Sequence, residues 1–168
     1  MMVSVRQAAY ENADWMQSSF DGLMGWKKPP GYFHNCCDRQ AEGQLVLLVA
    51  ADGDQYAGHV KVVWSPDYPY FRDNGIPEIQ DLNVLPTYRR QGVATALVDT
   101  GENLIRQRSK IAGIGVGLYA DYGPAQRMYV RRGYIPDGKG VTYHDVYVTP
   151  GASVPVDDDL VLFFVKAL

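Results

Sequence analysis

The 168-residue chain has little cysteine and no long apolar run. Its two cysteines, Cys36 and Cys37, are adjacent, and a disulfide between neighbours is strained and closes no useful loop. A reducing, cytoplasmic setting is the simpler interpretation. No apolar segment approaches the roughly 20 residues of a membrane span, and the N-terminus lacks the basic start and apolar stretch of a signal peptide. We therefore expect a cytoplasmic protein without a membrane partner.

Excess positive charge is also missing. The formal net charge is −3 at pH 7, whereas a nucleic-acid-binding protein needs a basic surface that neutralises phosphates. The charge argues against nucleic acid as a partner and is compatible with a small cationic substrate. His34 lies near the two cysteines, but the number and spacing of these residues do not fit a zinc site, so we expect no metal.

Two common phosphate-binding motifs are absent. The sequence has no Gly-x-x-x-x-Gly-Lys-Ser/Thr loop, and the spacing of Gly113, Gly115 and Gly117 differs from the dinucleotide-binding fingerprint. The chain length suits one domain with one sizeable core, so we expect residues 1–168 to form a single domain.

The stretch 78–98 has the pattern of a strand, a turn and a helix. Ile79, Leu82 and Val84 give the strand its apolar character, and Pro86 should end it because proline cannot continue a β-ladder. Beyond Arg90, apolar residues recur with helical spacing. We expect a strand over 78–85 followed by a long helix.

The turn places Arg89, Arg90, Gln91 and Gly92 at the start of this helix. Cations there are normally unfavourable, because a helix N-terminus is partially positive. A bound anion would explain them: free backbone N–H groups would bind it, the arginines would add charge, and the glycine would let the backbone come close. The alternative is an ordinary connection with two solvated arginines.

Further elements follow from local patterns. We expect strands at 3–6, 45–51, 56–64, 113–119, 140–148 and 159–166, and helices at 10–20 and 124–133. The strands 78–85 and 113–119 should run parallel, because a helix connects them. The glycines of 113–119 indicate a place where a backbone or a ligand approaches closely. The aromatic residues of 65–77 either line an acceptor pocket or pack onto the core.

Two motifs together resemble the GNAT superfamily of N-acetyltransferases. The first, Arg89-x-x-Gly92-x-Ala94, follows an apolar strand and is similar to the family's cofactor-binding motif. The second, Ala125-x-x-x-Tyr129-x-x-x-Gly133-Tyr134, resembles the family pattern Ala-x-x-x-Tyr-x-x-x-Gly-Phe/Tyr. The resemblance covers residues 78–135. It implies an α/β (α+β) fold with a mixed sheet of about six or seven strands and helices on both faces.

The resemblance also implies how the chain would bind acetyl-CoA. In the family, backbone amides of the turn hold the pyrophosphate. Tyr122 stands where many members carry asparagine. The cofactor-binding residues implied are Leu82, Asn83, Val84, Arg89, Arg90, Gln91, Gly92, Val93, Ala94, Thr95, Tyr122 and Ala125.

Tyr129 matches the family's tyrosine that donates a proton toward the coenzyme sulfur; the alternative is a buried aromatic residue on a helix face. Glu78 is the candidate general base, acting directly or through water, unless it is a solvated carboxylate at the strand end. Asp81 is the rival base. Because side chains alternate along a strand, Glu78 and Asp81 should point to opposite faces unless a bulge intervenes. His144 and Asp145 lie on a later segment that could border the acceptor pocket.

The resemblance implies an N-acetyltransferase that transfers the acetyl group of acetyl-CoA to a primary amine of a small molecule, by direct attack in a ternary complex. Two alternatives stay open: a protein or peptide N-acetyltransferase, and a regulatory module that binds coenzyme A without catalysis. Dimers are common in the family, so a homodimer is one assembly that the resemblance allows.

Overall fold

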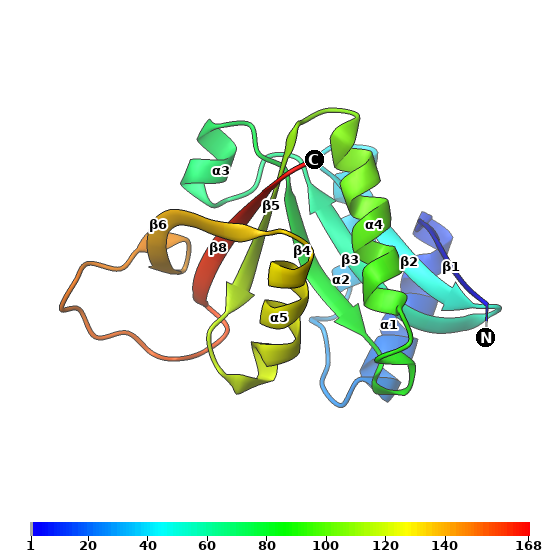
Figure 1. The fold of residues 1–168 in the computed structure, drawn as a ribbon. Coiled ribbons are helices and arrows are strands. Elements are labelled where there is room, and N and C mark those ends of the chain that lie inside the picture. The colour runs from blue at the N-terminus through cyan, green and yellow to red at the C-terminus, as the bar shows by residue number, and fades with distance from the viewer. Residues whose placement is uncertain (1) are drawn as a thin grey trace. The chain divides into compact units, whose positions relative to one another are not determined.

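The computed structural model describes residues 2–168, which form two compact units (Figure 1). Unit 1 comprises the residues up to 63 together with residues 79–104, and unit 2 comprises residues 64–78 and 105–168. The elements that lie wholly or mainly in unit 1 are β1 (Val3–Gln7), η1 (Tyr10–Asn12), α1 (Ala13–Leu23), α2 (Tyr32–Ala41), β2 (Leu45–Asp52), β3 (Gln55–Val63), β4 (Glu78–Val84), η2 (Pro86–Tyr88) and α4 (Val93–Arg106). The elements of unit 2 are α3 (Pro69–Asp73), β5 (Ile111–Gly117), η3 (Ala120–Tyr122), α5 (Gly123–Arg131), β6 (Ile135–Tyr143), β7 (Val146–Tyr147) and β8 (Leu160–Ala167).

The strands of unit 1 lie in the order β1-β2-β3-β4, with β2 antiparallel to both β1 and β3. The β2–β3 register shifts between Ala50 and Ala51, so that Ala57 is an extra residue on β3. This bulge lies next to Gly58. A Cβ atom at Gly58 would lie 2.4 Å from the carbonyl oxygen of Asn83, so glycine permits the close approach of β3 and β4.

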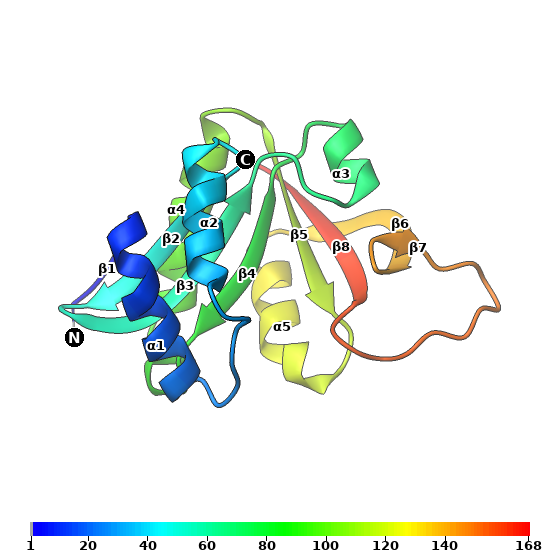
Figure 2. The same cartoon turned by 180° about the vertical axis from the view of Figure 1, so that it is seen from behind.

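Helices cover both faces of the unit 1 strands. Figure 2 shows α1 and α2 on one face, and Figure 1 shows α4 on the other. Met16, Phe20 and Phe33 are fully buried in the core under α1 and α2. The helix α2 was not predicted from the sequence, whereas the helix after residue 90 was predicted and begins at Val93.

The strands of unit 2 lie in the order β5-β8-β6-β7, and each neighbouring pair is antiparallel. His144 and Asp145 connect β6 to β7 and both adopt left-handed φ angles, of 50° and 61°. Such a pair is typical of a two-residue β-hairpin turn. The prediction of one strand over 140–148 was therefore wrong, because a tight turn interrupts it.

Aromatic rings fill the core of unit 2. Tyr68 stacks on Phe163 with ring centroids 3.8 Å apart, and Phe71 packs edge-on against the same ring at 5.2 Å. Tyr68 and Phe71 are both buried, which confirms the interpretation that residues 65–77 pack onto the core.

The glycines of β5 make room for rings in the same unit. A Cβ atom would lie 2.2 Å from Phe71 at Gly113, 2.8 Å from Phe163 at Gly115, and 2.4 Å from Tyr122 at Gly117. Side chains therefore occupy these positions, and the interpretation that the glycines leave space for a ligand was wrong.

The predicted combination of a sheet with helices on both faces is confirmed, with eight strands in residues 2–168 in place of six or seven. The parallel run of β4 and β5 stays a prediction, since they lie mainly in different units.

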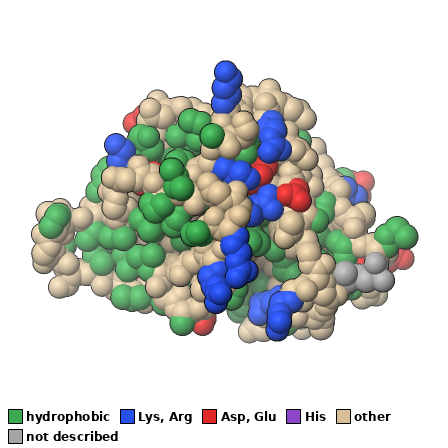
Figure 3. All heavy atoms as spheres, in the orientation of Figure 1, with side chains coloured by type: hydrophobic (Ala, Val, Ile, Leu, Met, Phe, Trp, Pro, Cys, Tyr) green, Lys and Arg blue, Asp and Glu red, His purple; other side chains and the backbone are tan. Residues whose placement is uncertain are grey.

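None of the helices in the described residues combines the length and apolar character that a membrane span requires. Figure 3 shows hydrophobic side chains on the molecular surface. The exposed hydrophobic residues of unit 2 include Ile135, Val146 and Val156, each more than 60% exposed.

Candidate active site

The turn before α4 carries a row of unpaired backbone donors. Arg90 and Gly92 adopt left-handed φ angles of 61° and 82°. Within residues 2–168, none of the N–H groups of residues 90–95 has a hydrogen-bond acceptor, and the helix begins its bonding with Ala96 N–H to the Gly92 carbonyl at 2.9 Å. Consecutive free N–H groups at a helix N-terminus form an anion-binding concavity.

Two side chains brace this turn. Arg89 Nε donates to the carbonyl of Val84 at 3.2 Å, and Gln91 Nε2 donates to the carbonyl of Thr87 at 2.7 Å. Arg90 is exposed. The turn thus keeps a left-handed conformation that side chains hold in place, while its own N–H groups stay available.

A cluster of polar side chains surrounds Asp81, which has a left-handed φ angle of 57° within β4, so simple alternation does not hold at this position. Its carboxylate accepts four hydrogen bonds from side chains. The donors are Lys28 Nζ (2.5 Å), Tyr32 OH (2.5 Å), His59 Nε2 (2.9 Å) and Asn83 Nδ2 (2.7 Å).

The cluster extends beyond the carboxylate through His59. Because Nε2 donates to Asp81, Nδ1 of the neutral imidazole is the acceptor, and it accepts a hydrogen bond from the Tyr56 hydroxyl at 2.5 Å. His59 is fully buried and Tyr56 is 3% exposed. We call these residues, Lys28, Tyr32, Tyr56, His59, Asp81 and Asn83, the Asp81 cluster.

The ionisation states in the cluster follow from burial and partners. Burial alone would raise the pKa of Asp81, but the hydrogen bond from His59 and the ammonium of Lys28 outweigh it and hold the pKa well below its usual range. Burial lowers the pKa of His59, although the neighbouring carboxylate raises it. Burial and the same carboxylate raise the pKa values of Tyr32 and Tyr56. At neutral pH Asp81 is therefore an anion whose acceptor positions are filled, which makes it a poor general base.

Two buried lysines of unit 1 lie close together: Lys28, which belongs to the cluster, and Lys61, which lies beside it. Lys28 is 8% exposed, and its Nζ lies 5.2, 5.0 and 4.6 Å from the ring centroids of Phe20, Trp26 and Tyr32. Lys61 is 9% exposed, and its Nζ lies 5.3 Å from the centroid of Tyr32. Lys28 is paired with Asp81, whereas Lys61 Nζ has no hydrogen bond or ion pair within the described residues.

In unit 2, Tyr129 lies on α5 and is 5% exposed. Burial raises its pKa to about 12, so the hydroxyl keeps its proton at neutral pH. No hydrogen bond of this hydroxyl is found in the part of the chain that the structure describes. Its ring lies 6.1 Å from that of Tyr134. The side chain is buried, as expected for an aromatic residue on the inner face of a helix, yet its hydroxyl is still available as a hydrogen-bond donor.

The other predicted residues of unit 2 are more constrained. Tyr122 donates its hydroxyl to Asp158 at 2.8 Å while its ring packs over Gly117, so its polar group is already committed. Ala125 is half-buried on α5. Glu78 begins β4 and is 7% exposed, so the interpretation as a solvated strand-end carboxylate was wrong.

Sequence reasoning missed five residues around Asp81: Lys28, Tyr32, Tyr56, His59 and Lys61. The one signal available lay in β3, where His59 and Lys61 interrupt a run of mostly apolar residues. Every position of this strand except the first is buried. Polar residues in such a strand need partners. His144, by contrast, is exposed in a turn, with Nδ1 3.5 Å from Asp159.

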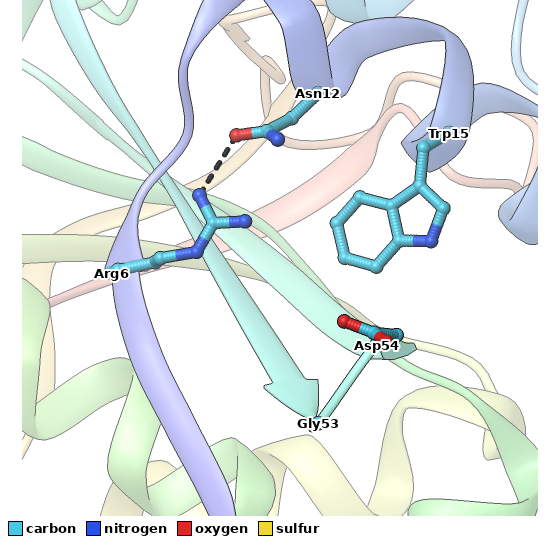
Figure 4. A pocket seen from close by; sticks show the side chains of 5 residues that line it. All are labelled: Arg6, Asn12, Trp15, Gly53 and Asp54. Atoms are coloured by element: carbon cyan, nitrogen blue, oxygen red, sulfur yellow. Dashed lines mark hydrogen bonds between the residues drawn. The ribbon is translucent and has the colours of Figure 1, made fainter.

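Elsewhere in unit 1, Arg6, Asn12, Trp15, Gly53 and Asp54 line a surface pocket. In Figure 4, Arg6 donates to Asn12, at 2.8 Å, while the indole of Trp15 lies on the other side of the pocket. No residue of the Asp81 cluster lines it. Among residues 2–168, no group of three or more His, Cys, Asp or Glu side chains could hold a metal ion.

Comparisons with known proteins agree on one family. The model of the acetyltransferase (GNAT) family matches residues 9–134, whereas no curated protein matches. A solved protein from Desulfovibrio desulfuricans, described as a GNAT-family acetyltransferase, has a TM-score of 0.72 and 16% identity, covering 99% of both chains. Arabidopsis thaliana NAA60, in complex with acetyl-CoA, has a TM-score of 0.70 and 17% identity, covering 99% of both chains. A ribosomal-protein-alanine N-acetyltransferase from Brucella melitensis has a TM-score of 0.65 and 16% identity, covering 98% of this chain and 99% of its own. The chain belongs to the GNAT family of acetyltransferases.

Proposed function

We propose that the protein is an acetyl-CoA-dependent N-acetyltransferase that acetylates a primary amine of a small molecule. The observation that carries the proposal is the row of free N–H groups over residues 90–95, with left-handed residues at Arg90 and Gly92. This cradle fits a pyrophosphate, because it offers several donors and the positive end of a 14-residue helix.

The residues that hold the coenzyme in this proposal are those of the turn, Arg89 to Thr95, with Leu82, Asn83 and Val84 of β4 and Tyr122 and Ala125 of unit 2. Bound acetyl-CoA supplies the acetyl group as a thioester. The side chain of Asn83 is committed to Asp81, and that of Tyr122 to Asp158, so the coenzyme contacts of both residues are assigned to their backbone or ring.

Two side chains carry the proton transfers. An alkylamine with a pKa of about 10.4 must lose a proton before it can attack a thioester, and Glu78 is the proposed acceptor of that proton, directly or through water. Tyr129 is the proposed donor to the departing thiolate, since its hydroxyl is protonated and has no partner in the described residues. The saturated hydrogen bonding of Asp81 supports Glu78 over Asp81 as the base.

A peptide acceptor is the second candidate, because one of the structural neighbours is named as a ribosomal-protein-alanine N-acetyltransferase. The third candidate is a module that binds coenzyme A without turnover, which the free Tyr129 hydroxyl disfavours. Cytoplasmic location, a single domain over residues 1–168 and a homodimer stay predictions.

The test is a screen of small amines and N-terminal peptides that follows free thiol released from acetyl-CoA. Activity on small amines supports the proposal, activity on peptides alone supports the second candidate, and tight coenzyme binding without thiol release supports the third.

Two variants then separate chemistry from binding. Tyr129→Phe should lower kcat roughly 10²-fold or more, the range for a positioned general acid, with coenzyme affinity nearly unchanged. Gly92→Asp should abolish coenzyme binding in calorimetry with the fold intact, because it places a negative charge at the cradle. Gly92→Asn is the matched control that imposes similar backbone strain without the charge. Unchanged affinity in Gly92→Asp would mean that the anion binds elsewhere, and equal losses for the two Gly92 variants would mean that the backbone conformation, not the added charge, causes the loss.

A further inference from the structure

The environment of Lys61 leaves one positive charge uncompensated. Among the described residues, the buried side-chain polar atoms without partners are Gln17 Oε1 and His34 Nδ1. The Lys61 ammonium has no hydrogen bond either, so it keeps contact with solvent while the rest of the side chain is buried. Charges that lie largely within a protein are normally paired, and an ammonium that keeps contact with solvent and has no counter-charge in the described residues can take a ligand anion as its partner.

No group of the Asp81 cluster can supply that partner. The carboxylate of Asp81 already accepts four hydrogen bonds, one of them from the ammonium of Lys28. His59 is neutral, and Tyr32 and Tyr56 keep their protons, because burial opposes the charged form of each. The cluster with Lys61 therefore contains two ammonium groups and one carboxylate, and the missing charge is negative.

The surroundings of Lys61 are polar and aromatic. Its Nζ lies 5.3 Å from the ring centroid of Tyr32, which also faces Lys28 at 4.6 Å. The charge of Lys61 lowers the pKa of Cys36, although burial raises the pKa of that thiol more strongly. The ammonium thus lies at α2, beside a ring whose hydroxyl is fixed by Asp81 and which cannot turn away without breaking that bond.

We propose that Lys61 binds a carboxylate of the acceptor, so that the substrates are amines that also carry an acidic group, as amino acids and acidic peptides do. This inference rests on the proposed function for the reaction, but it assigns the substrate class independently of Glu78 and Tyr129. Lys28 does not bind the ligand; it keeps Asp81 ionised and holds Tyr32 beside Lys61. A lysine binds such an anion as a point charge.

The test uses acceptor pairs that differ only in the carboxylate. One arm compares free amino acids with their carboxamides, and the other compares peptides with Glu or Gln after the N-terminal residue; the arms distinguish a small molecule from a peptide. We expect kcat/KM to favour the acid in one arm by tenfold to hundredfold, the range for a hydrogen bond to a charged group. Lys61→Met should reduce that ratio to near one, whereas Lys27→Met, which removes an exposed lysine that precedes Lys28 in the chain, should leave it unchanged.

A binding measurement keeps the inference testable if no acceptor turns over. N-acetyl amino acids and their amides are titrated into the protein saturated with coenzyme A, and chemical-shift changes give each Kd. Carboxylate-dependent binding that Lys61→Met removes supports the inference even if the proposed reaction fails. An unchanged acid-to-amide ratio in Lys61→Met overturns it, as does the absence of carboxylate preference in both assays. A loss of coenzyme affinity with unchanged acceptor ratios would assign Lys61 to the coenzyme and also overturn it.

Discussion

The two units bury different chemistry. Unit 1 encloses an ion pair and a neutral histidine: Lys28, Asp81 and His59 form a hydrogen-bonded cluster beneath α1 and α2. Unit 2 encloses aromatic rings, with Phe71 and Phe163 packed over glycines of β5. The stability of unit 1 should therefore depend on charge and pH, and that of unit 2 on volume. Each prediction below tests one side of this contrast.

The largest effect is expected for Asp81→Ala. Removing the carboxylate leaves the ammonium of Lys28 and the donors of Tyr32 and His59 without an acceptor in a buried site. Breaking a buried ion pair in this way costs about 3–5 kcal/mol. Denaturant unfolding should show the loss, whereas Asp38→Ala, at an exposed position of α2, should change the free energy of unfolding little. A loss below about 1 kcal/mol, the worth of an exposed ion pair, would mean that the cluster is solvated.

The counterpart in unit 2 is Gly113→Ala. The added methyl would lie 2.2 Å from the ring of Phe71, which is fully buried. Overpacking of this kind costs about 1–3 kcal/mol. The double variant with Phe71→Leu should recover part of the loss, because the smaller side chain makes room. Gly123→Ala has no neighbour within 4 Å and should be neutral or slightly stabilising. Equal losses at Gly113 and Gly123 would contradict the packing argument.

The contrast also predicts a pH dependence that belongs to unit 1. The pKa of His59 is lower in the folded than in the unfolded chain, so below about pH 6.5 the unfolded state binds a proton that the folded state does not. Stability should therefore fall as the pH drops from 7.5 toward 5, by at most about 1.4 kcal/mol per pH unit for one proton. Asp81 adds a further loss below about pH 3.9, where its unfolded form takes up a proton.

The measurement is the free energy of unfolding across this pH range for the wild type, His59→Gln and His144→Gln. Glutamine at position 59 can donate and accept hydrogen bonds without titrating, so the slope between pH 7.5 and 5 should flatten. His144 is exposed, and its replacement should leave the slope unchanged. A slope that survives in His59→Gln would place the titrating group outside the cluster.

Local patterns in the sequence predicted the elements that local chemistry determines. The apolar residues of β4 predicted the strand, and Pro86 predicted its end. The helical spacing of apolar residues after Arg90 predicted α4. The missed helix α2 contains histidine, asparagine and two cysteines, which have weak helix propensity. Its formation depends on burial of Phe33 and Cys36 in the core, which no local pattern reveals.

The candidate site was predictable where it is local and unpredictable where it is not. The anion cradle lies within one turn, so Arg89 to Thr95 could be named from the sequence. The Asp81 cluster joins segments far apart in the chain, from Lys28 to Asn83. The left-handed conformation of Asp81 places its carboxylate among them, and a strand pattern predicts regular alternation instead.

The smallest expected effect compares the two buried lysines of unit 1. Lys61→Met substitutes an apolar side chain of similar length for an ammonium that has no hydrogen bond or ion pair within the described residues. The free energy of unfolding should therefore stay within about 1 kcal/mol of the wild-type value or rise above it. Lys28→Met should lose about 3–5 kcal/mol, because it leaves Asp81 buried without its ammonium. Denaturant unfolding at pH 7.5, without ligands, measures both. Similar losses for the two variants would mean that Lys61 has a counter-charge in the free protein, and the charge count behind the acceptor carboxylate would fail. Stability retained in Lys61→Met, together with a lost preference for acidic acceptors, would show that this lysine is kept for binding at no benefit to the fold.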